Sequence, residues 1–384
     1  MAGQRPRPGA LNLRTDRALA VFVVGVIGVL IPGLQPQLLG ALAAEGHLSV
    51  AALGLLATAE LLAMGLAAGG AGFILPATRL VAIAAIALLT TGAIDLVTPF
   101  LGSGALFGAR IVAGLAEGVL IWIAIGLIVR TSHPERWSGI YLAVQTLAQF
   151  ALASAIGYSA AGSRGAFTAL GVVTLAGLLA LPWLPHSYAP LATDGEPGGL
   201  PHARGLVALG GVVAYLAFIV AVWVYIEPLA LEHGVPAATI HLIAPLSLAM
   251  QVLGAGAAAL LAERVPARLA IAAVGLLNLG LLATMAAPPS PAAFLVATAA
   301  FGFLWLFILP FQISIAIAAD PSRRAALLIG GAQLTGSSLG PFLAGLLIGD
   351  KDVARVLWFG AFCAAAGMMA LIGAGTARRL SRKV

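Results

Sequence analysis

Apolar residues run along this chain in long stretches, separated by short segments that hold most of the charges and helix-breaking residues. A helix needs roughly 20 apolar residues to cross the hydrocarbon core of a bilayer. The alternating pattern of a transmembrane β-strand is absent, so the stretches predict helices. Twelve spans are predicted, at residues 17–40, 50–71, 79–98, 104–129, 137–160, 166–184, 206–229, 238–262, 268–286, 292–317, 325–348 and 353–375.

The basic residues indicate how these spans are oriented. With the N-terminus inside, nearly all Arg and Lys residues outside the spans fall in cytoplasmic segments, and the outer loops hold only Arg164, Lys351 and Arg355. Cytoplasmic loops of membrane proteins carry such an excess of positive charge. An even number of spans with both termini cytoplasmic is therefore predicted.

One long polar stretch, "PHSYAPLATDGEPGGLPHAR", interrupts the pattern at residues 185–204. Its prolines and glycines and its lack of a helical period indicate a loop. Six predicted spans lie on each side of it, which is a common plan among transporters. We expect an N-terminal six-helix bundle over 1–184, a cytoplasmic linker over 185–204 and a C-terminal six-helix bundle over 205–384.

Composition supports an all-α membrane protein. The chain is 61% hydrophobic and 9% charged, with a mean hydropathy of +1.06, whereas soluble domains are about 25% charged. The pI near 10.1 could indicate a nucleic-acid partner, but the basic residues lie where topology requires them, so no nucleic acid is expected.

Motifs for catalysis and cofactor binding are absent from the sequence. The single cysteine, Cys363, allows neither a disulfide framework nor a cysteine-based metal site. The sequence has no phosphate-binding P-loop, no nucleophile elbow and no histidines at metal-ligand spacing. We therefore expect no enzyme activity, no cofactor and no metal.

Four short motifs stand in order along the chain: "RIVAGLAEG" at 110–118, "GSRGAF" at 162–167, "AVWVYIEPLALEHG" at 221–234 and "LAERVPAR" at 261–268. Over nearly its whole length the chain resembles the major facilitator superfamily, most closely the twelve-helix drug and sugar efflux branch. In that resemblance "GSRGAF" corresponds to a short outer loop and "LAERVPAR" to the second-half copy of a basic cytoplasmic loop.

The sequence departs from the family pattern at two places. The first-half basic loop has Leu75 where an acid is expected and Thr78 where glycine is usual. The predicted fifth helix has Gln145 and Gln149 in place of the Gly-Pro motif that marks proton antiporters. The branch resemblance favours efflux, whereas the missing antiporter motif favours uptake or symport.

The resemblance implies a central cavity between the two bundles, lined by helices 1, 2, 4, 5, 7, 8, 10 and 11. Polar side chains inside a membrane avoid lipid and face protein or water, and most of those in this chain lie on these eight helices. Hydrogen bonds between helices are an equal alternative for Gln145, Gln149 and Gln333, and packing is the alternative for the aromatic residues. The substrate-binding candidates are Gln35, Gln37, Gln145, Gln149, Trp223, Tyr225, Gln251, Trp305 and Gln333.

The predicted fourth helix carries two charges, Arg110 and Glu117, although a charge at the bilayer centre costs about 3 kcal/mol on insertion scales. These residues share one helical face with Gly114 and Gly118, and this face is expected to line a water-filled cavity. Because they are about 10 Å apart along the helix axis, we expect each to find its partner on another helix.

Depth suggests candidate partners for these charges. Glu60 and Glu117 both fall near mid-membrane, while Arg110 lies nearer the outer side, not far from the depth of Asp95. Burial and a second nearby acid favour the protonated form of a carboxyl group. We expect Glu117 or Glu60 to carry a coupling proton and Arg110 to stabilise the ionised form or an anionic substrate group. The alternative is an ion pair that only ties two helices together.

Gating residues are predicted at both ends of the spans. Glu227 and His241 lie near the outer ends of helices 7 and 8 and form a possible outer gate pair, with solvated helix ends as the alternative. The resemblance implies that Glu263, Arg264 and Arg268 lock the cytoplasmic side, with plain topology signals as the alternative.

The sequence as a whole predicts a monomeric, multi-pass secondary active transporter of the cell inner membrane. It would move a small organic solute by alternating access, coupled to protons, with efflux favoured over uptake. The alternatives are a non-transporting membrane receptor or scaffold of the same fold and a facilitative uniporter. A channel is disfavoured because nothing in the sequence resembles a ring-built selectivity filter.

Overall fold

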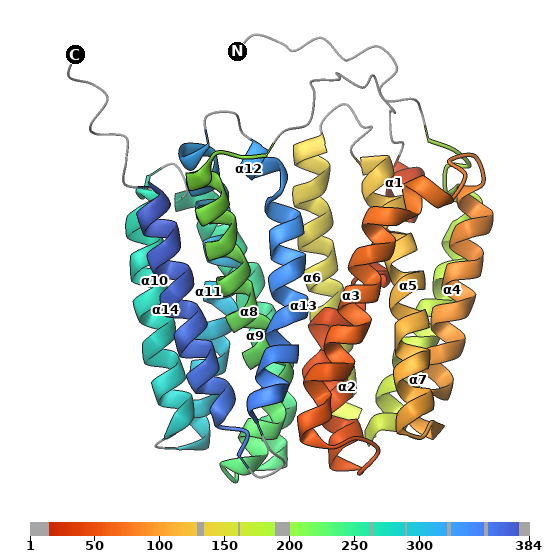
Figure 1. The fold of residues 1–384 in the computed structure, drawn as a ribbon. Coiled ribbons are helices and arrows are strands. Elements are labelled where there is room, and N and C mark those ends of the chain that lie inside the picture. Colours follow the sequence, from red (N-terminus) through yellow and green to blue (C-terminus); the bar gives the residue numbers. More distant parts are fainter. Residues whose placement is uncertain are drawn as a thin grey trace, which may run out of the picture. The chain divides into compact units, whose positions relative to one another are not determined.

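The computed structural model describes residues 15–128, 134–159, 162–188, 200–261, 264–288, 290–320, 324–348 and 352–375, and its regular structure is helical throughout (Figure 1). The elements are α1 (Thr15–Ile27), α2 (Leu30–Ala44), α3 (Val50–Ile74), α4 (Leu80–Val97), η1 (Thr98–Phe100), α5 (Ser103–Ile128), α6 (Pro134–Ser159), α7 (Gly162–Ala176), η2 (Gly177–Trp183), α8 (Ala203–Glu232), α9 (Ala237–Leu261), α10 (Ala267–Ala286), α11 (Pro291–Ala319), α12 (Arg324–Leu327), α13 (Ile329–Leu347) and α14 (Arg355–Gly375).

Eleven helices among the described residues are long and apolar enough to cross a membrane. The remaining predicted span, at residues 325–348, corresponds to α13, a 19-residue helix rich in glycine and serine. The predicted all-α architecture of twelve long helices is confirmed. The helix predicted to begin at residue 166 instead begins at Gly162, whose φ of 62° lies in the left-handed region. The "GSRGAF" motif therefore forms the first turns of α7 and not an outer loop.

The first span is interrupted where α1 gives way to α2. Pro32, in the first turn of α2, has no N–H to donate to the carbonyl four residues before it, which favours a break at this point. The N–H of Val29 bonds to Val26 O at 3.0 Å, which is the tighter three-residue spacing. The carbonyl of Gly25 accepts the hydroxyl of Tyr141 at 2.8 Å, so α6 satisfies a group that the break leaves free.

The described chain divides into two compact units. Unit 1 comprises Met1–Leu34, Ala59–Leu152 and Ala161–Glu196, and unit 2 comprises Gln35–Thr58, Ala153–Ala160 and Pro197–Val384. Unit 2 thus holds parts of α2, α3 and α6 together with α8 to α14. The predicted division into 1–184, a linker at 185–204 and 205–384 stays a prediction, and residues 189–199 lie outside the described part of the chain.

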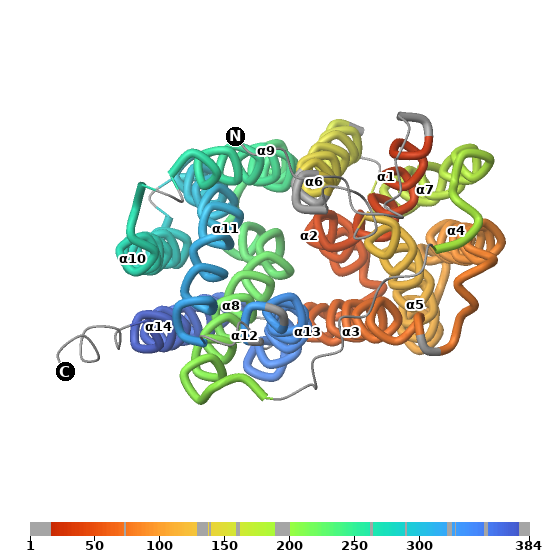
Figure 2. Tube along the Cα trace, turned by 90° about the horizontal axis from the view of Figure 1, so that it is seen from above, coloured from red at the N-terminus to blue at the C-terminus, as the bar shows by residue number. Residues whose placement is uncertain are grey.

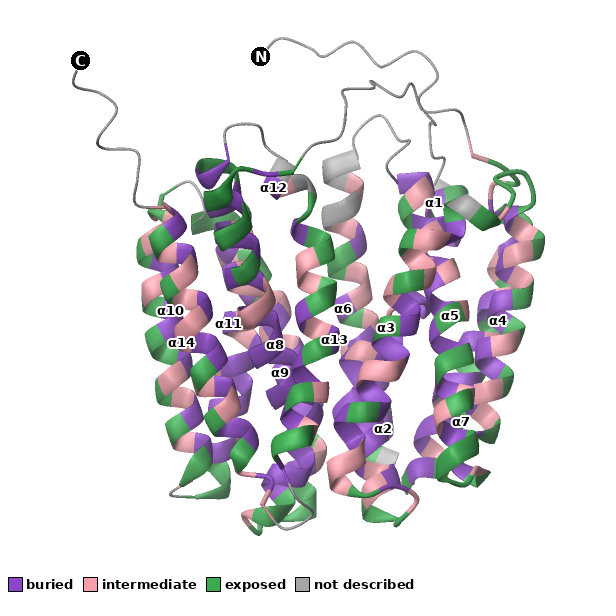
Figure 3. Ribbon diagram, viewed as in Figure 1, coloured by how far each residue is buried: buried purple, intermediate pink, exposed green. Residues whose placement is uncertain are grey.

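The core of unit 2 is built on α8. Every residue from Tyr215 to Ala230 is buried, which is the pattern of a helix surrounded on all sides (Figure 3). Both α13 and α14 pack on α8, and α11 packs on α9 and α10 (Figure 2). Large apolar side chains such as Leu276 and Phe362 are exposed on outward faces, as expected for surfaces that meet lipid.

Small residues bring the helices of unit 2 into close contact. On α13, a Cβ atom added at Gly336 or Gly340 would lie 2.3 Å from Val213 O or 2.2 Å from Ala217 O of α8. The run of small residues at 336–345 thus permits close helix approach. On α11, a Cβ at Gly302 would lie 2.3 Å from Ser247 O of α9.

We predict that Gly302→Ala destabilises the protein by roughly 1–3 kcal/mol, because the added methyl group overpacks a backbone contact. Gly280→Ala on α10 is the matched control, since its added Cβ would have no neighbour within 4 Å. Thermal unfolding of the purified protein should give a lower Tm for Gly302→Ala and an equal or higher Tm for Gly280→Ala. Equal melting of both variants would contradict the close α9–α11 contact.

Candidate functional site

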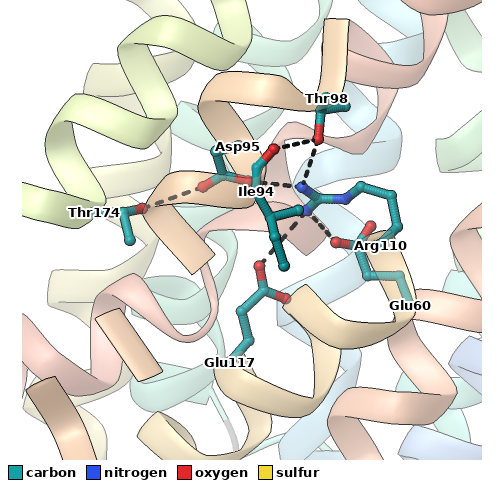
Figure 4. A network of polar contacts seen from close by, with 7 residues as sticks. All are labelled: Glu60, Ile94, Asp95, Thr98, Arg110, Glu117 and Thr174. Atoms are coloured by element: carbon teal, nitrogen blue, oxygen red, sulfur yellow. Dashed lines mark hydrogen bonds and ion pairs between the residues drawn. The ribbon is translucent and has the colours of Figure 1, made fainter. Parts of the chain in front are cut away.

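The guanidinium of Arg110 lies at the centre of a buried polar cluster inside unit 1 (Figure 4). Its Nη1 is 2.7 Å from Asp95 Oδ1 of α4, and its Nη2 donates to Glu60 Oε1 of α3. The same Nη2 lies 3.7 Å from Glu117 Oε1, on α5 itself. The four side chains are 0–3% exposed. One cation therefore joins carboxyl groups from three helices, away from both water and lipid.

A second layer of contacts fixes the orientation of this cluster. Thr98 Oγ1 lies 3.5 Å from Arg110 Nη1, and the hydroxyl of Thr174 donates to Asp95 Oδ2 at 3.4 Å. The ring centroid of Phe167 lies 5.5 Å from Arg110 Cζ, a distance at which the aromatic face attracts the cation. Through Thr174 and Phe167, α7 also contributes to the site.

The order of the helices explains how Asp95 reaches Arg110. Asp95 lies in the last turn of α4, and a short connection leads to α5, which begins at Ser103. Arg110 comes two turns into α5, so the antiparallel pair brings the two side chains to similar depth. The sequence placed Asp95 near this depth but gave it no role, and Thr98 and Thr174 carried no signal because threonine is common in membrane helices.

Arg110 finds partners on other helices, as expected. The expectation that Arg110 and Glu117 do not approach each other is wrong. Helical side chains lean toward the N-terminus, so Glu117 extends back along α5 toward Arg110. The two long side chains together close the axial separation, and their charged atoms come within 3.7 Å.

The shared face of Arg110, Gly114, Glu117 and Gly118 is packed, and it does not line a water-filled cavity as expected. A Cβ added at Gly114 would lie 2.4 Å from Glu60 O, and one at Gly118 would lie 2.2 Å from Met64 O. The two glycines thus let the backbone of α3 cover this face of α5, which also places Glu60 within reach of Arg110.

The cluster contains one permanent cation and three carboxyl groups. If all three carboxyls were ionised, two negative charges would remain uncompensated in a buried site, which is strongly unfavourable. The cluster is electrically neutral when two carboxyls carry a proton. Oε2 of Glu60, Oε2 of Glu117 and Nε of Arg110 have no hydrogen-bond partner among the described residues. The site therefore combines a charge imbalance with two carboxyl oxygens, on Glu60 and Glu117, that have no bonded partner among the described residues.

Two of the predicted substrate-binding glutamines bind backbone carbonyls. The amide of Gln37 donates to Ala153 O of α6 at 3.1 Å, and that of Gln149 donates to Val29 O at 2.6 Å, beside the break between α1 and α2. The contact of Gln149 is of the kind named as its alternative role, a hydrogen bond between helices.

Other glutamines keep unpaired amide atoms. Gln35 and Gln312 are each 0% exposed, and the amide oxygen and nitrogen of both lack a hydrogen-bond partner within the described part of the chain. Nε2 of Gln251 on α9 is also buried without a partner there. Gln145 and Gln333 are half-buried. Gln312 on α11 was not among the predicted substrate-binding residues. Its position inside a long apolar stretch was the feature of the sequence that could have identified it.

The aromatic candidates lie in the core of unit 2. Trp223 of α8 and Trp305 of α11 make an edge-to-face contact, with ring centroids 5.8 Å apart. The hydroxyl of Tyr225 accepts the N–H of Gly54 of α3 at 2.8 Å. These three side chains pack and bond within unit 2. Packing was the alternative to a substrate-binding role for these residues.

The predicted gating residues have separate surroundings. Glu227, 8% exposed, packs against Gly40 of α2, whereas the backbone carbonyl of His241 packs against Gly157 of α6. The structure thus gives the two residues different neighbours and does not bring them together as a gate pair.

The predicted cytoplasmic lock is described only in part, because Glu263 lies outside the described residues. Arg264 is exposed and donates to Leu260 O in the last turn of α9. Arg268 is half-buried and packs against Gly375 at the end of α14.

The chain shares its fold with solved membrane transporters. A bacterial homolog to the human lysosomal transporter Spinster, in an inward-facing and unoccupied conformation, has a TM-score of 0.64 and 14% identity over 95% of each chain. A mutant of the nucleoside transporter NupG has a TM-score of 0.71 and 12% identity over 93% of this chain and 99% of its own.

A D-xylose-proton symporter has a TM-score of 0.70 and 12% identity over 94% of this chain and 97% of its own. No protein-family model and no curated protein matches the sequence. At these identities the likeness shows the fold alone, which is the twelve-helix major facilitator fold that the sequence predicted.

We predict that Arg110→Gln destabilises the protein by roughly 3–5 kcal/mol at neutral pH, because three buried carboxyl groups lose their cation. The deficit should shrink as the pH falls, since protonated carboxyls need no counter-charge. Arg264→Gln, at an exposed position, is the control. Thermal unfolding measured between pH 5 and 8 tests this, and a deficit that does not change with pH would contradict the charge argument.

Proposed function

We propose that this protein is a secondary active transporter that moves a small organic solute across the cell inner membrane by alternating access, coupled to protons and acting as a monomer. The observation that carries the proposal is the buried cluster of one guanidinium and three carboxyl groups in the membrane-spanning part of unit 1. Ionisable groups at such depth are costly and mark ion or substrate pathways. The shared fold with three transporters supports the same conclusion.

Glu117 is the proposed proton carrier. Glu60 and Asp95 bond directly to Arg110, whereas the closest approach of Glu117 to Arg110 is 3.7 Å, which is longer than a hydrogen bond. A proton on Glu117 therefore costs the guanidinium no direct bond. When the proton leaves, Glu117 competes with Glu60 and Asp95 for the same cation, so the charge change reaches the contacts that hold α3 and α4 to α5.

The proposed solute is one with several hydrogen-bonding groups. Gln35, Gln251 and Gln312 supply buried amide atoms that the described residues leave unpaired, and Trp223 and Trp305 lie in the same unit. Nucleosides and D-xylose, the solutes named for two of the similar structures, have this chemistry. Efflux is favoured by the motif resemblance and uptake by Gln145 and Gln149, so transport is to be tested in both directions.

A second candidate function is a non-transporting membrane receptor or scaffold. The packed face of α5 favours it, because Gly114 and Gly118 hold α3 tightly over the charged residues. In that case the Arg110 cluster only ties helices together. Substitutions in the cluster would then change stability without changing any solute flux. A facilitative uniporter would show solute flux without a response to a pH gradient.

Our prediction for transport concerns Glu117→Gln, which removes the titrating group and keeps its shape. A thermal-shift screen of metabolites and drugs at two pH values would first identify a stabilising solute. In proteoliposomes, Glu117→Gln should lower accumulation driven by a pH gradient by roughly tenfold or more. It should retain exchange of the solute at equal concentrations, because exchange needs no net proton movement.

Asp352→Asn is the control, since it removes a carboxyl from an exposed ion pair with Arg355 that contributes little to stability. Glu60→Gln should impair both transport modes, because Glu60 bonds directly to Arg110. Unchanged proton dependence in both Glu117→Gln and Glu60→Gln would rule out the cluster as the coupling site. Absence of flux with every stabilising solute would favour the scaffold.

A further inference from the structure

The carboxyl group of Glu227 is buried on α8 without a partner. The residue is 8% exposed, and its carboxyl group forms no hydrogen bond or ion pair with any residue that the structure describes. The backbone of α2 lies over it, since a Cβ atom added at Gly40 would be 2.9 Å from Glu227 Oε2 and 3.3 Å from Glu227 Cβ. The missing side chain at position 40 therefore leaves the space that the carboxyl group occupies.

The helices of unit 2 around Glu227 supply no cation to this carboxyl group. Residues 35–44 of α2, residues 50–58 of α3, α11 and α13 hold no Asp, Glu, His, Lys or Arg. On α9 the one such residue is His241, which has different neighbours. On α14 it is Arg355, which is paired with Asp352 at 2.5 Å. An ionised Glu227 would thus be a buried charge without a counter-ion, which is strongly unfavourable.

The remaining titratable groups of the packed helices lie elsewhere or have other partners. Glu232 of α8 accepts the N–H of Val353 at 2.7 Å, and the hydroxyl of Tyr225 accepts the N–H of Gly54. The short α12 packs at the opposite, N-terminal end of α8, where a Cβ at Gly205 would meet Ala325. A proton is therefore what makes the buried Glu227 neutral. These remaining groups are Arg204, Tyr215, Tyr225 and Glu232 of α8, Arg324 of α12 and Cys363 of α14.

A hollow in unit 2 lies beside this carboxyl group. It has a volume of about 260 Å³, enough for several water molecules. Gly40, whose backbone covers Glu227, lines the hollow, and so do Pro228 and Leu231, which lie one position and about one turn beyond Glu227 on α8. Glu232, at the end of α8 that is predicted to face outward, also lines it. The hollow thus reaches to within one helical turn of the buried carboxyl group.

We propose that Glu227 is a second proton-binding site of the protein, separate from the Arg110 cluster, and that its proton exchanges with the outer solution through this hollow. Glu227 carries the proton while Gly40 covers it, and it releases the proton when residues 35–44 of α2 move away and water reaches the carboxylate. The outer side thus closes over a neutral carboxyl group. The consequence for transport rests on the proposed function, whereas the protonation itself does not.

The protonation can be tested without any solute by infrared spectroscopy of the full-length protein in lipid bilayers. A protonated carboxyl group has a C=O stretching band that is separate from the bands of carboxylates and amides. At neutral pH, Glu227→Gln should remove the band intensity of one carboxyl group, because glutamine keeps the shape of the side chain and cannot carry the proton.

Glu232→Gln is the matched control for this experiment. Glu232 is exposed, and an amide oxygen can also accept the N–H of Val353, so the variant should leave the band unchanged. An unchanged band in Glu227→Gln, or an equal loss in Glu232→Gln, would overturn the proposal.

A second variant leaves Glu227 in place. Gly40→Ala puts a methyl group against Oε2 of Glu227, so the carboxyl group must move and its band should shift or disappear. Gly256→Ala on α9, where an added Cβ has no neighbour within 4 Å, is the control and should leave the band in place. The same band position in Gly40→Ala as in the unaltered protein would contradict a protonated carboxyl group under α2.

In the transport assay, Glu227 and Glu117 should each account for one coupled proton. One coupled proton supports about tenfold accumulation of a solute per pH unit, since a pH unit and a tenfold concentration ratio are equal in free energy. Across about one pH unit, Glu227→Gln should therefore accumulate roughly tenfold less solute, and the double variant with Glu117→Gln roughly 100-fold less.

A slower approach to the same final accumulation in Glu227→Gln would indicate a purely structural role and overturn the second coupling site. If the unaltered protein transports no solute, the proposed function fails. The infrared experiment then still decides whether Glu227 binds a proton.

Discussion

Arg110 imposes the constraint on which the arrangement of unit 1 depends. A guanidinium cannot be deprotonated in a protein, so a buried arginine in a membrane helix must be met by acids. The structure meets it with Glu60 from α3, Asp95 from α4 and Glu117 from α5. The contacts that permit this are apolar: the glycines at 114 and 118 bring α3 close enough for Glu60 to reach the cation. Close packing and charge pairing at this site therefore require each other.

The sequence predicted the twelve long helices because span length and charge placement follow directly from the thickness and polarity of a bilayer. It also singled out Arg110, Glu60 and Glu117, since a charge at bilayer depth needs a reason. It did not predict how they pair. Counting residues from a span end gives the depth of a side chain, whereas the direction in which it points depends on how neighbouring helices pack. Asp95 therefore appeared at nearly the right depth and was not recognised as a partner.

The glutamines are a second case in which the sequence does not predict the partners of a buried polar side chain. Gln149 and Gln35 are the same residue type at buried positions, yet Gln149 donates to Val29 O beside a helix break and Gln35 has no partner among the described residues. A helix break changes which backbone carbonyls are free, and neighbouring side chains then satisfy some of them. Tyr141 does this for Gly25 O at the same break. Whether a polar side chain binds backbone or remains available thus depends on backbone geometry that residue type does not encode.

The Arg110 cluster places three carboxyl groups around one cation. Asp95 and Glu60 occupy the two terminal nitrogens, Glu117 stands at 3.7 Å, and Nε has no partner in the described chain. The proposed coupling requires two arrangements, one with Glu117 protonated and outside the bonded set, the other with Glu117 ionised and closer to the cation. Because the competing acids come from α3, α4 and α5, the two arrangements differ in which helices the guanidinium holds together. A proton can bias such a two-state element only if its position changes helix contacts. Glu117 meets that requirement because its neighbour Arg110 also binds carboxyl groups from two other helices.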